Sequence, residues 1–235
     1  MRFARFLRVK PICNAVFWLR FFWFVRLKRQ VRVFEEKGGV RSHDYSLDVL
    51  LQGRTSARIL RVIQPLTSID RLGPDARVLS IGCRYETDLL YLVGYGLRAE
   101  NVRGLDMISY SDWIDLGNMH DMRYPDDAWD AVLLGWVLSY STEPAVAARE
   151  VVRVTRDGGL IAVGVSYYPP EVVRARVAEG KGNFGTGRNA PIQTTAEILE
   201  LFRPWVDHVY YNHVPDPRGQ GSSVAIFSIR KKPAR

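Results

Sequence analysis

The alternation of short apolar runs with amphipathic segments predicts a parallel α/β sheet in the larger part of the chain. Its clearest stretch is 77–106, where an apolar run at 78–81 breaks at Gly82, a helical segment follows near 87–95, and a second apolar run ends on Asp106. Strand, turn, helix and strand within about 30 residues form a βαβ unit, whose right-handed crossover makes the strands parallel. Ligands of such sheets bind outside the carboxyl ends of the strands. Asp106 follows Gly82 by 24 positions, a spacing typical of a ribose-binding carboxylate.

The later segments extend this pattern. Strand-like runs lie at 113–116, 131–136 and 160–165, and helical spacing at 143–155 and 194–202, the latter opened by a Thr194–Glu197 capping box. Two more β-like runs, 206–211 and 224–230, are separated by a turn that allows an antiparallel hairpin. We expect a helix over 46–64, weakened at Gly53 and ended by Pro65, and a loop or lid over the glycine-rich stretch 181–191.

Residues 1–34 differ from the rest of the chain in charge and aromatic content. They contain nine Lys or Arg residues, no acid, and nine of the protein's 27 aromatic residues. The longest uncharged run, 11–19, falls short of the roughly 20 apolar residues that span a bilayer. This composition is typical of a helix that lies on an anionic membrane surface. The alternatives are a helix buried against the domain or a second subunit and, as a minor option, an organelle presequence.

The positive charge of the chain belongs to this segment. The net charge is +8, but residues 35–235 contain 24 bases against 25 acids, a net charge of −1. A nucleic-acid-binding domain spreads positive charge over its body, so we do not expect that class. Cys13 and Cys83 form no disulfide framework and suit a reducing, cytoplasmic compartment, and no Cys/His cluster has the spacing of a metal site.

Four segments in order resemble motifs of the class I S-adenosylmethionine-dependent methyltransferases (type 11-like), over roughly residues 66–232. Residues 78–83 (VLSIGC) resemble the glycine-rich first motif, and 104–106 (GLD) resemble the second-strand end whose acid holds the ribose hydroxyls. Residues 117–130 resemble the "GDAxxLPFPDxxFD" segment, and 153–159 (RVTRDGG) resemble the "RVLxPGG" turn. The resemblance implies a Rossmann-like, doubly wound, mostly parallel seven-stranded sheet with an antiparallel last strand, and S-adenosylmethionine as the cofactor.

The first motif departs from the family pattern, acid-x-Gly-x-Gly-x-Gly. Ser80 stands at the acid, and Arg84 and Glu86 stand at the second and third glycines. We hypothesise that Arg84 pairs with the carboxylate of the cofactor's methionine part and Glu86 with its ammonium group. The alternative is that the two form a structural pair in a site that has lost its cofactor. By resemblance, the cofactor-binding residues are Ser80, Gly82, Cys83, Arg84, Glu86, Asp106, Met107, Asn118, Met119 and Trp136.

Within this set, two residues face the adenine by resemblance. Asn118 replaces the acid that commonly receives the adenine amino group, and its amide oxygen can still accept that hydrogen bond. Trp136 is expected to flank the adenine or to fill the core.

Two residues are candidates for catalysis. Methyl transfer from a sulfonium needs positioning, and it needs a base when the acceptor loses a proton. His120, after the third predicted strand, is a candidate base, and Tyr140, after the fourth, is a candidate for orienting the acceptor. Structural roles are open for both, and His208 and His213 are expected at the surface.

These observations lead to one main functional hypothesis and two others. We expect methyl transfer to a small-molecule or glycan/lipid-precursor acceptor, by a cytoplasmic protein held at a membrane face through residues 1–34. The alternative is a non-catalytic methyltransferase-like module that docks a membrane or partner. A dinucleotide-dependent oxidoreductase fits less well because G-x-G-x-x-G is absent. The expected organisation is a basic aromatic segment (1–37), a helical lead-in (38–65) and a methyltransferase-like domain (66–235). The sequence does not give the oligomeric state.

Overall fold

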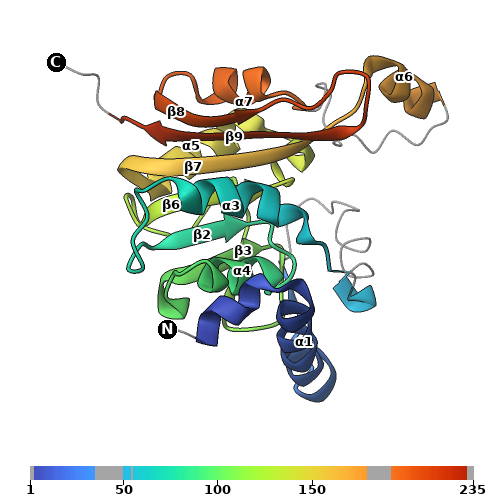
Figure 1. The fold of residues 1–235 in the computed structure, drawn as a ribbon, viewed down its shortest axis with the longest axis vertical. Helices are drawn as coiled ribbons and strands as arrows, with labels where there is room; N and C mark the ends of the chain where they lie inside the picture. The colour runs from blue at the N-terminus through green and yellow to red at the C-terminus, as the bar shows by residue number, and fades with distance from the viewer. Residues whose placement is uncertain (1–2, 35–49, 54, 179–191, 232–235) are drawn as a thin grey trace.

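A seven-stranded sheet forms the centre of the protein (Figure 1). The computed structural model describes residues 3–34, 50–53, 55–178 and 192–231. The strands follow the order β5-β3-β2-β6-β7-β9-β8; β9 is antiparallel to both its neighbours, and the other pairings are parallel. This confirms the expected doubly wound sheet with a reversed last strand. The strands are β2 (Val78–Ile81), β3 (Val102–Asp106), β5 (Ile114–Leu116), β6 (Trp129–Gly135), β7 (Thr155–Tyr167), β8 (Val206–His213) and β9 (Gly221–Ile229).

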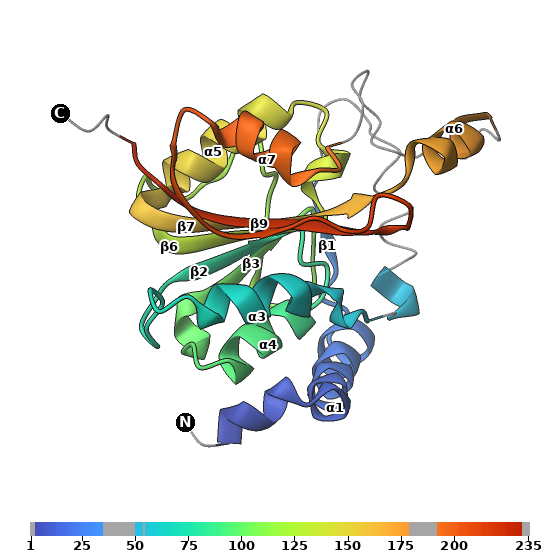
Figure 2. The same ribbon diagram turned by 45° about the horizontal axis from the view of Figure 1, so that its top comes forward.

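Helices cover both faces of the sheet (Figure 2). Side chains alternate across each buried strand, so that Val78 faces one apolar core and Leu79 the other. The first core contains α3 and α4, and the second contains α5 and α7. The helices are α3 (Leu60–Ser68), α4 (Thr87–Gly94), α5 (Pro144–Val154), α6 (Pro170–Ala178) and α7 (Thr195–Phe202), with short helical turns η3 (Ala57–Ile59), η4 (Ala99–Asn101) and η5 (Leu138–Tyr140).

Most predicted elements occur where the pattern placed them, but Pro65 does not end its helix. Residues 50–52 are helical and end in a turn at Gly53, and the next helical part begins at η3 and runs through α3 to Ser68, with Pro65 inside it. Proline removes one backbone hydrogen bond, and burial of Val62, Ile63 and Leu66 offsets that loss. Gly53 is a turn residue with φ +62°. The first residues of the predicted helix, 46–49, and the glycine-rich stretch 181–191 lie outside the described residues.

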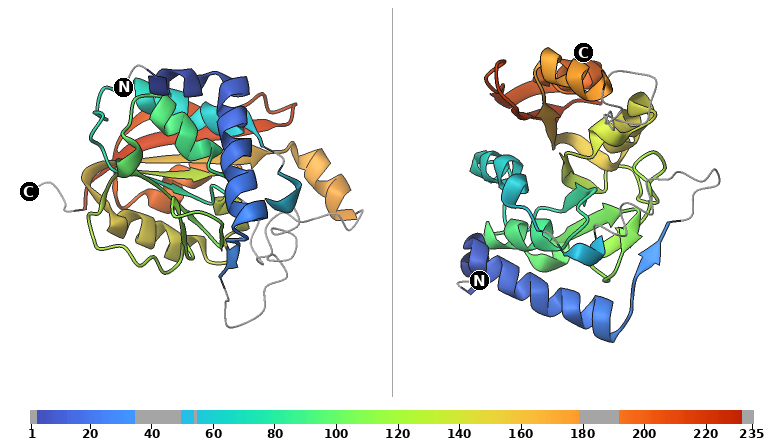
Figure 3. Two further views of the ribbon diagram at one scale, coloured as in Figure 1. Left: turned by 90° about the horizontal axis from the view of Figure 1, so that it is seen from below. Right: turned by 90° about the vertical axis from the view of Figure 1, so that its right-hand side faces the viewer.

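The N-terminal segment lies along the side of the domain that carries α4 (Figure 3). It contains η1 (Phe3–Arg8), α1 (Lys10–Phe21), the π-helical turn η2 (Phe22–Leu27) and β1 (Arg32–Val33). Phe17 and Phe21 are buried against Tyr85, and β1 pairs antiparallel with β4 (Ile108–Ser109). The inner face of this segment is thus part of the domain core, as one of the alternatives predicted. Within the described residues, no helix is long and apolar enough to cross a bilayer.

The outer face of the same segment stays exposed. Large apolar side chains there include Leu19, which is 74% exposed, and Trp18, Phe22 and Trp23. The segment therefore buries one apolar face and presents another to solvent, which is unusual for a surface helix.

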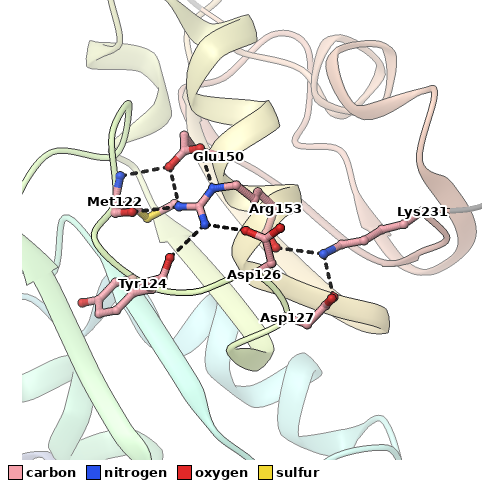
Figure 4. Close-up of polar contacts among 7 residues, drawn as sticks. All are labelled: Met122, Tyr124, Asp126, Asp127, Glu150, Arg153 and Lys231. Carbon is pink, nitrogen blue, oxygen red and sulfur yellow. Dashed lines mark hydrogen bonds and ion pairs between the residues drawn. The ribbon is translucent and has the colours of Figure 1, made fainter.

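A polar network centred on Arg153 holds the chain between β5 and β6 (Figure 4). The Arg153 guanidinium donates to the carboxylates of Glu150 and Asp126 and to the carbonyls of Tyr124 and Met122. Lys231 donates to Asp127 and to the Arg153 carbonyl. Arg153 and residues 117–130 belong to two of the resembling motifs, so this network gives those motifs a structural role.

Candidate active site

The ends of three parallel strands meet at one point. The Gly82 N–H donates to the Leu105 carbonyl at 2.8 Å, and the Gly117 N–H donates to the Asp106 carbonyl at 3.0 Å. These bonds join the carboxyl ends of β2, β3 and β5. The pocket predicted at Gly82 and Asp106 therefore has a defined place in the fold, at the edge where parallel sheets bind ligands.

The turn after β2 requires glycine at its first position. Gly82 has φ +69°, and a Cβ there would lie 2.5 Å from the Val137 Cγ2 atom. Arg84, two residues on, also has a positive φ of 50°, which is costly for a residue with a Cβ. In the described part of the chain the Arg84 guanidinium has no hydrogen bond or ion pair. The turn thus brings bare backbone and one cation, whose charge acts on Asp106, to the site.

Asp106 lies beside this turn and is half-buried. Its Oδ2 atom accepts a hydrogen bond from the Arg84 N–H at 2.8 Å, and Oδ1 accepts one from the Ile108 N–H at 3.1 Å. Burial raises the pKa of Asp106, and these backbone hydrogen bonds act in the opposite direction. The bonds fix the carboxylate and leave further lone pairs on both oxygens for a ligand's hydroxyl groups.

Asp88 is a site residue that the sequence reasoning missed. It lies in the first turn of α4 and is half-buried. Burial raises its pKa well above the ordinary value, the charge of Asp106 adds to this rise, and Arg58 opposes it. Two carboxylates therefore share one partly dry site. The sequence could have indicated this residue, because it is an acid between Thr87 and Leu89 in the first turn of the helix, and both of these neighbours are buried.

Glu86 does not face the ligand, which corrects the hypothesis that it pairs with a cofactor ammonium group. Its side chain is fully buried, and both carboxylate oxygens accept hydrogen bonds from Arg20 of α1, at 2.6 and 2.8 Å. The Glu86 N–H donates to the Tyr110 hydroxyl at 2.9 Å. The alternative, a structural pair of Glu86 with Arg84, is also wrong because Glu86 is bound by Arg20 instead.

Three other predicted site residues point into the protein interior. Cys83 is buried, and its Sγ atom lies 2.6 Å from where a Cβ on Gly104 would be, so it packs beneath β3. Met119 is buried in the core next to α5 and α7. Ser80 is fully buried, and among the described residues its hydroxyl has no hydrogen-bond partner. In contrast, Met107 lies half-buried beside Asp106, and its carbonyl accepts from the Phe34 N–H.

Asn118, His120 and Ser141 form a hydrogen-bonded chain. His120 Nδ1 lies 2.6 Å from Asn118 Oδ1, and His120 Nε2 lies 2.7 Å from the Ser141 hydroxyl. These partners assign the tautomer in which Nδ1 donates to the amide oxygen and Nε2 accepts from Ser141. The Asn118 oxygen expected to receive adenine therefore already binds His120, whose N–H also donates to it. The arrangement orients His120 as a proton acceptor at Nε2.

Trp136 lies toward β7 and not beside Asp106. Its backbone N–H donates to the Gly164 carbonyl at 2.7 Å, and its ring lies against Gly164. The Arg58 guanidinium stacks on the ring, with Cζ 4.2 Å from the centroid. Trp136 is buried in the core that contains α3 and α4, as the second of its two expected roles predicted, and its contact with adenine stays a prediction. Tyr140 is 66% exposed, at the rim of the site. Arg58, like Asp88, was not among the residues predicted from the sequence.

Comparisons with known proteins agree with this arrangement. A sequence model described as a methyltransferase domain matches residues 79–163. A chain of the complex between the Haloferax volcanii Trm112 methyltransferase activator and a methyltransferase is 16% identical, with a TM-score of 0.58, covering 84% of this chain and 100% of that chain. A comparison with curated proteins found no match.

Two further solved structures have the same fold. A SAM-dependent methyltransferase from Thermotoga maritima is 17% identical, with a TM-score of 0.51, covering 80% of this chain and 99% of that one. A geranyl diphosphate methyltransferase in complex with SAM is 13% identical, with a TM-score of 0.51, covering 83% and 93%. At these identities the likeness establishes the fold of this chain.

Proposed function

We propose that this protein transfers a methyl group from S-adenosylmethionine to a small-molecule or glycan/lipid-precursor acceptor at a membrane surface. The match of residues 79–163 to a methyltransferase-domain model and the class I fold support this proposal. The observation that carries the proposal is the placement of Asp106. Its carboxylate ends β3, is fixed by the N–H groups of Arg84 and Ile108, and remains partly exposed beside the Gly82 turn.

The residues present fit the cofactor that this domain implies. Asp106 would hold the ribose hydroxyls, and the Gly82 turn would let backbone approach the ligand closely. Arg84 would bind the carboxylate of the methionine part, and Asp88 would be the ammonium partner in place of Glu86, which is bound by Arg20. When bound, S-adenosylmethionine supplies an electrophilic methyl group on a sulfonium.

The chain's own residues would manage the acceptor's proton. His120 Nε2 accepts from the Ser141 hydroxyl, and Asn118 fixes the opposite nitrogen. We infer that an acceptor hydroxyl or amine passes its proton to His120, either directly in place of Ser141 or through the Ser141 hydroxyl. Tyr140, exposed at the rim, is suited to orienting the acceptor.

The membrane part of the proposal rests on the outer face of residues 1–34. Exposed apolar side chains of α1 and η2 are accompanied by the exposed cations Arg26, Lys28 and Arg29 and by no acid in this segment. Rings at headgroup depth with cations beside them suit an anionic lipid surface.

Calorimetric titration with S-adenosylmethionine and S-adenosylhomocysteine tests the cofactor claim directly. We expect the full chain to bind both, and Asp106→Ala to weaken binding at least tenfold, because a charged group's hydrogen bonds contribute about 1.5–3 kcal/mol. Asp112→Ala removes an exposed acid and serves as the matched control, expected to leave affinity unchanged. Absence of binding at millimolar ligand would reject the enzyme and favour a non-catalytic module.

A further inference from the structure

Two arginines of the lead-in reach the same place near the carboxyl end of β7. Arg58 Nη1 lies 3.4 Å from the Ser166 hydroxyl, and Arg61 Nη1 donates to the Ser222 hydroxyl at 2.9 Å. Ser166 and Ser222 are register partners across β7 and β9. Since directly paired residues of antiparallel strands lie about 5 Å apart, the two guanidinium groups are neighbours.

The acid that acts on this pair is Asp88, on whose pKa the charge of Arg58 has a lowering effect. In the described part of the chain, Arg58 and Arg61 form no ion pair, whereas several other arginines do. Burial lowers the pKa of Arg58, the nearby Arg61 and Arg84 act in the same direction, and Tyr140 and Tyr168 oppose it. Both side chains are exposed, and their like charges repel each other at this edge of the site; a bound anion would relieve that repulsion.

Arg58 is also held in a fixed position. Its guanidinium stacks on Trp136, which lies just beyond β6 at a positive φ of 61° and rests against Gly164. A Cβ at Gly135, the last residue of β6, would lie 2.6 Å from Ile59 Cδ1, so η3 packs closely over this strand end. The cation is therefore preorganised and need not be ordered when a ligand binds.

The strand order places this pair on the acceptor side of the site. β2 lies between β3, which ends in Asp106, and β6, which precedes Trp136. Arg58 and Arg61 lie beyond β6, over β7 and β9, on the opposite side of β2 from Asp106. A nucleoside bound at Asp106 leaves the β6–β7 side for the second substrate.

We propose that Arg58 and Arg61 form a binding site for an anionic group, a phosphate or a carboxylate, on the methyl acceptor. Guanidinium groups bind both anions through paired N–H donors, and two adjacent guanidinium groups can hold one anionic group from two directions. Ser166 and Ser222 would release or share their hydrogen bonds on binding. This inference rests on the proposed methyltransferase function, because it assigns the substrate of that same site.

Titration of the full chain with inorganic pyrophosphate and with succinate tests the site, in the presence and absence of S-adenosylhomocysteine. We expect at least one of the two anions to bind, and the preferred one identifies the class. The double variant Arg58→Gln/Arg61→Gln should weaken that binding about tenfold or more, because it removes both charged donors. Arg58→Lys/Arg61→Lys keeps both charges and should retain much of the affinity.

The matched control is Arg149→Gln, which removes an exposed arginine from α5 on the other face of the sheet. It should leave anion affinity unchanged, and thermal unfolding should show that all variants remain folded. Anion binding that is absent, or equal in the wild type and the double glutamine variant, overturns the proposal. If the anion site fails in this way but S-adenosylhomocysteine still binds, the proposed methyltransferase function stands. If the anion binds through the two arginines but S-adenosylhomocysteine does not bind, the anion site stands and its assignment to a methyl acceptor is overturned.

Discussion

Arg20 in the N-terminal helix and Glu86 in the turn after β2 form a two-point ion pair. The Nε and Nη2 atoms of Arg20 lie 2.6 and 2.8 Å from the two carboxylate oxygens of Glu86, which is fully buried. Glu86 stands where the resembling family has its third glycine. Glu86 therefore has a structural role: its side chain anchors the N-terminal segment to the turn.

Breaking this pair should have unequal effects at its two ends. Arg20→Ala leaves a buried carboxylate without its cation, which costs about 3 kcal/mol of unfolding free energy. Glu86→Gln leaves Arg20 to be hydrated, since its side chain is 38% exposed, and should cost about 1 kcal/mol. Urea denaturation at neutral pH measures both values.

A matched control exists on the same segment. Arg26 is exposed, and Arg26→Ala should change the unfolding free energy by no more than about 0.5 kcal/mol. The double variant Arg20→Ala/Glu86→Gln should be less destabilised than the sum of the single changes, because the two residues interact directly. Equal losses for Arg20→Ala and Glu86→Gln would contradict this account.

Gly82→Ala should disrupt the turn and the ligand site together. The residue has φ +69°, which costs an L-residue about 1–2 kcal/mol, and the added Cβ would lie 2.5 Å from Val137. We expect loss of stability and loss of S-adenosylhomocysteine binding by calorimetry. Adding Val137→Ala restores the space but not the backbone freedom, so it should recover part of the stability. Gly73→Ala, where nothing lies within 4 Å of the new Cβ, should be nearly neutral.

The sequence predicted the sheet better than it predicted the site. Strand and helix positions follow from local apolar periodicity, and Gly82 and Asp106 follow from the geometry of a βαβ unit. The partner of Glu86 is 66 positions away on a segment whose inner face could not be read from its composition. Arg58 and Asp88 were missed for the same reason, because their surroundings come from strand ends distant in sequence. The direction of a side chain at a tight turn depends on tertiary contacts, which the apolar periodicity of the sequence does not predict.

Asp88 should make the protein less stable as the pH rises. Its pKa is raised in the folded state above the ordinary 3.8, so the native state holds a proton that the unfolded state has lost. The resulting stability is fully present below 3.8 and disappears as the pH rises through the raised value. Asp88→Asn removes this loss, so the variant should exceed the wild type in unfolding free energy at pH 7 and match it near pH 4.

The same variant separates stability from ligand binding. Asp88→Asn should bind S-adenosylhomocysteine more weakly, because it removes the proposed partner of the ligand's ammonium group, although the protein is more stable. Asp112→Asn, an exposed acid, should change neither quantity. If Asp88→Asn instead lowers the unfolding free energy at pH 7, the prediction is wrong, and the Asp88 carboxylate stabilises the protein without a ligand.

Membrane association should depend on the outer face of the N-terminal segment. Deleting the segment is a poor test, because Phe17, Phe21 and Arg20 hold the domain together. Leu19→Glu/Trp23→Glu changes exposed positions alone and should reduce co-sedimentation with phosphatidylserine vesicles at least tenfold, since burying one such side chain contributes about 1.5–3 kcal/mol. Val214→Glu, an equally exposed apolar position on the β8–β9 connection, is the control and should have no effect.

Wild-type binding to the vesicles should also fall with added salt, because the cations of the N-terminal segment act on anionic lipid. Undiminished co-sedimentation of the double glutamate variant would show that this outer face does not bind the vesicles.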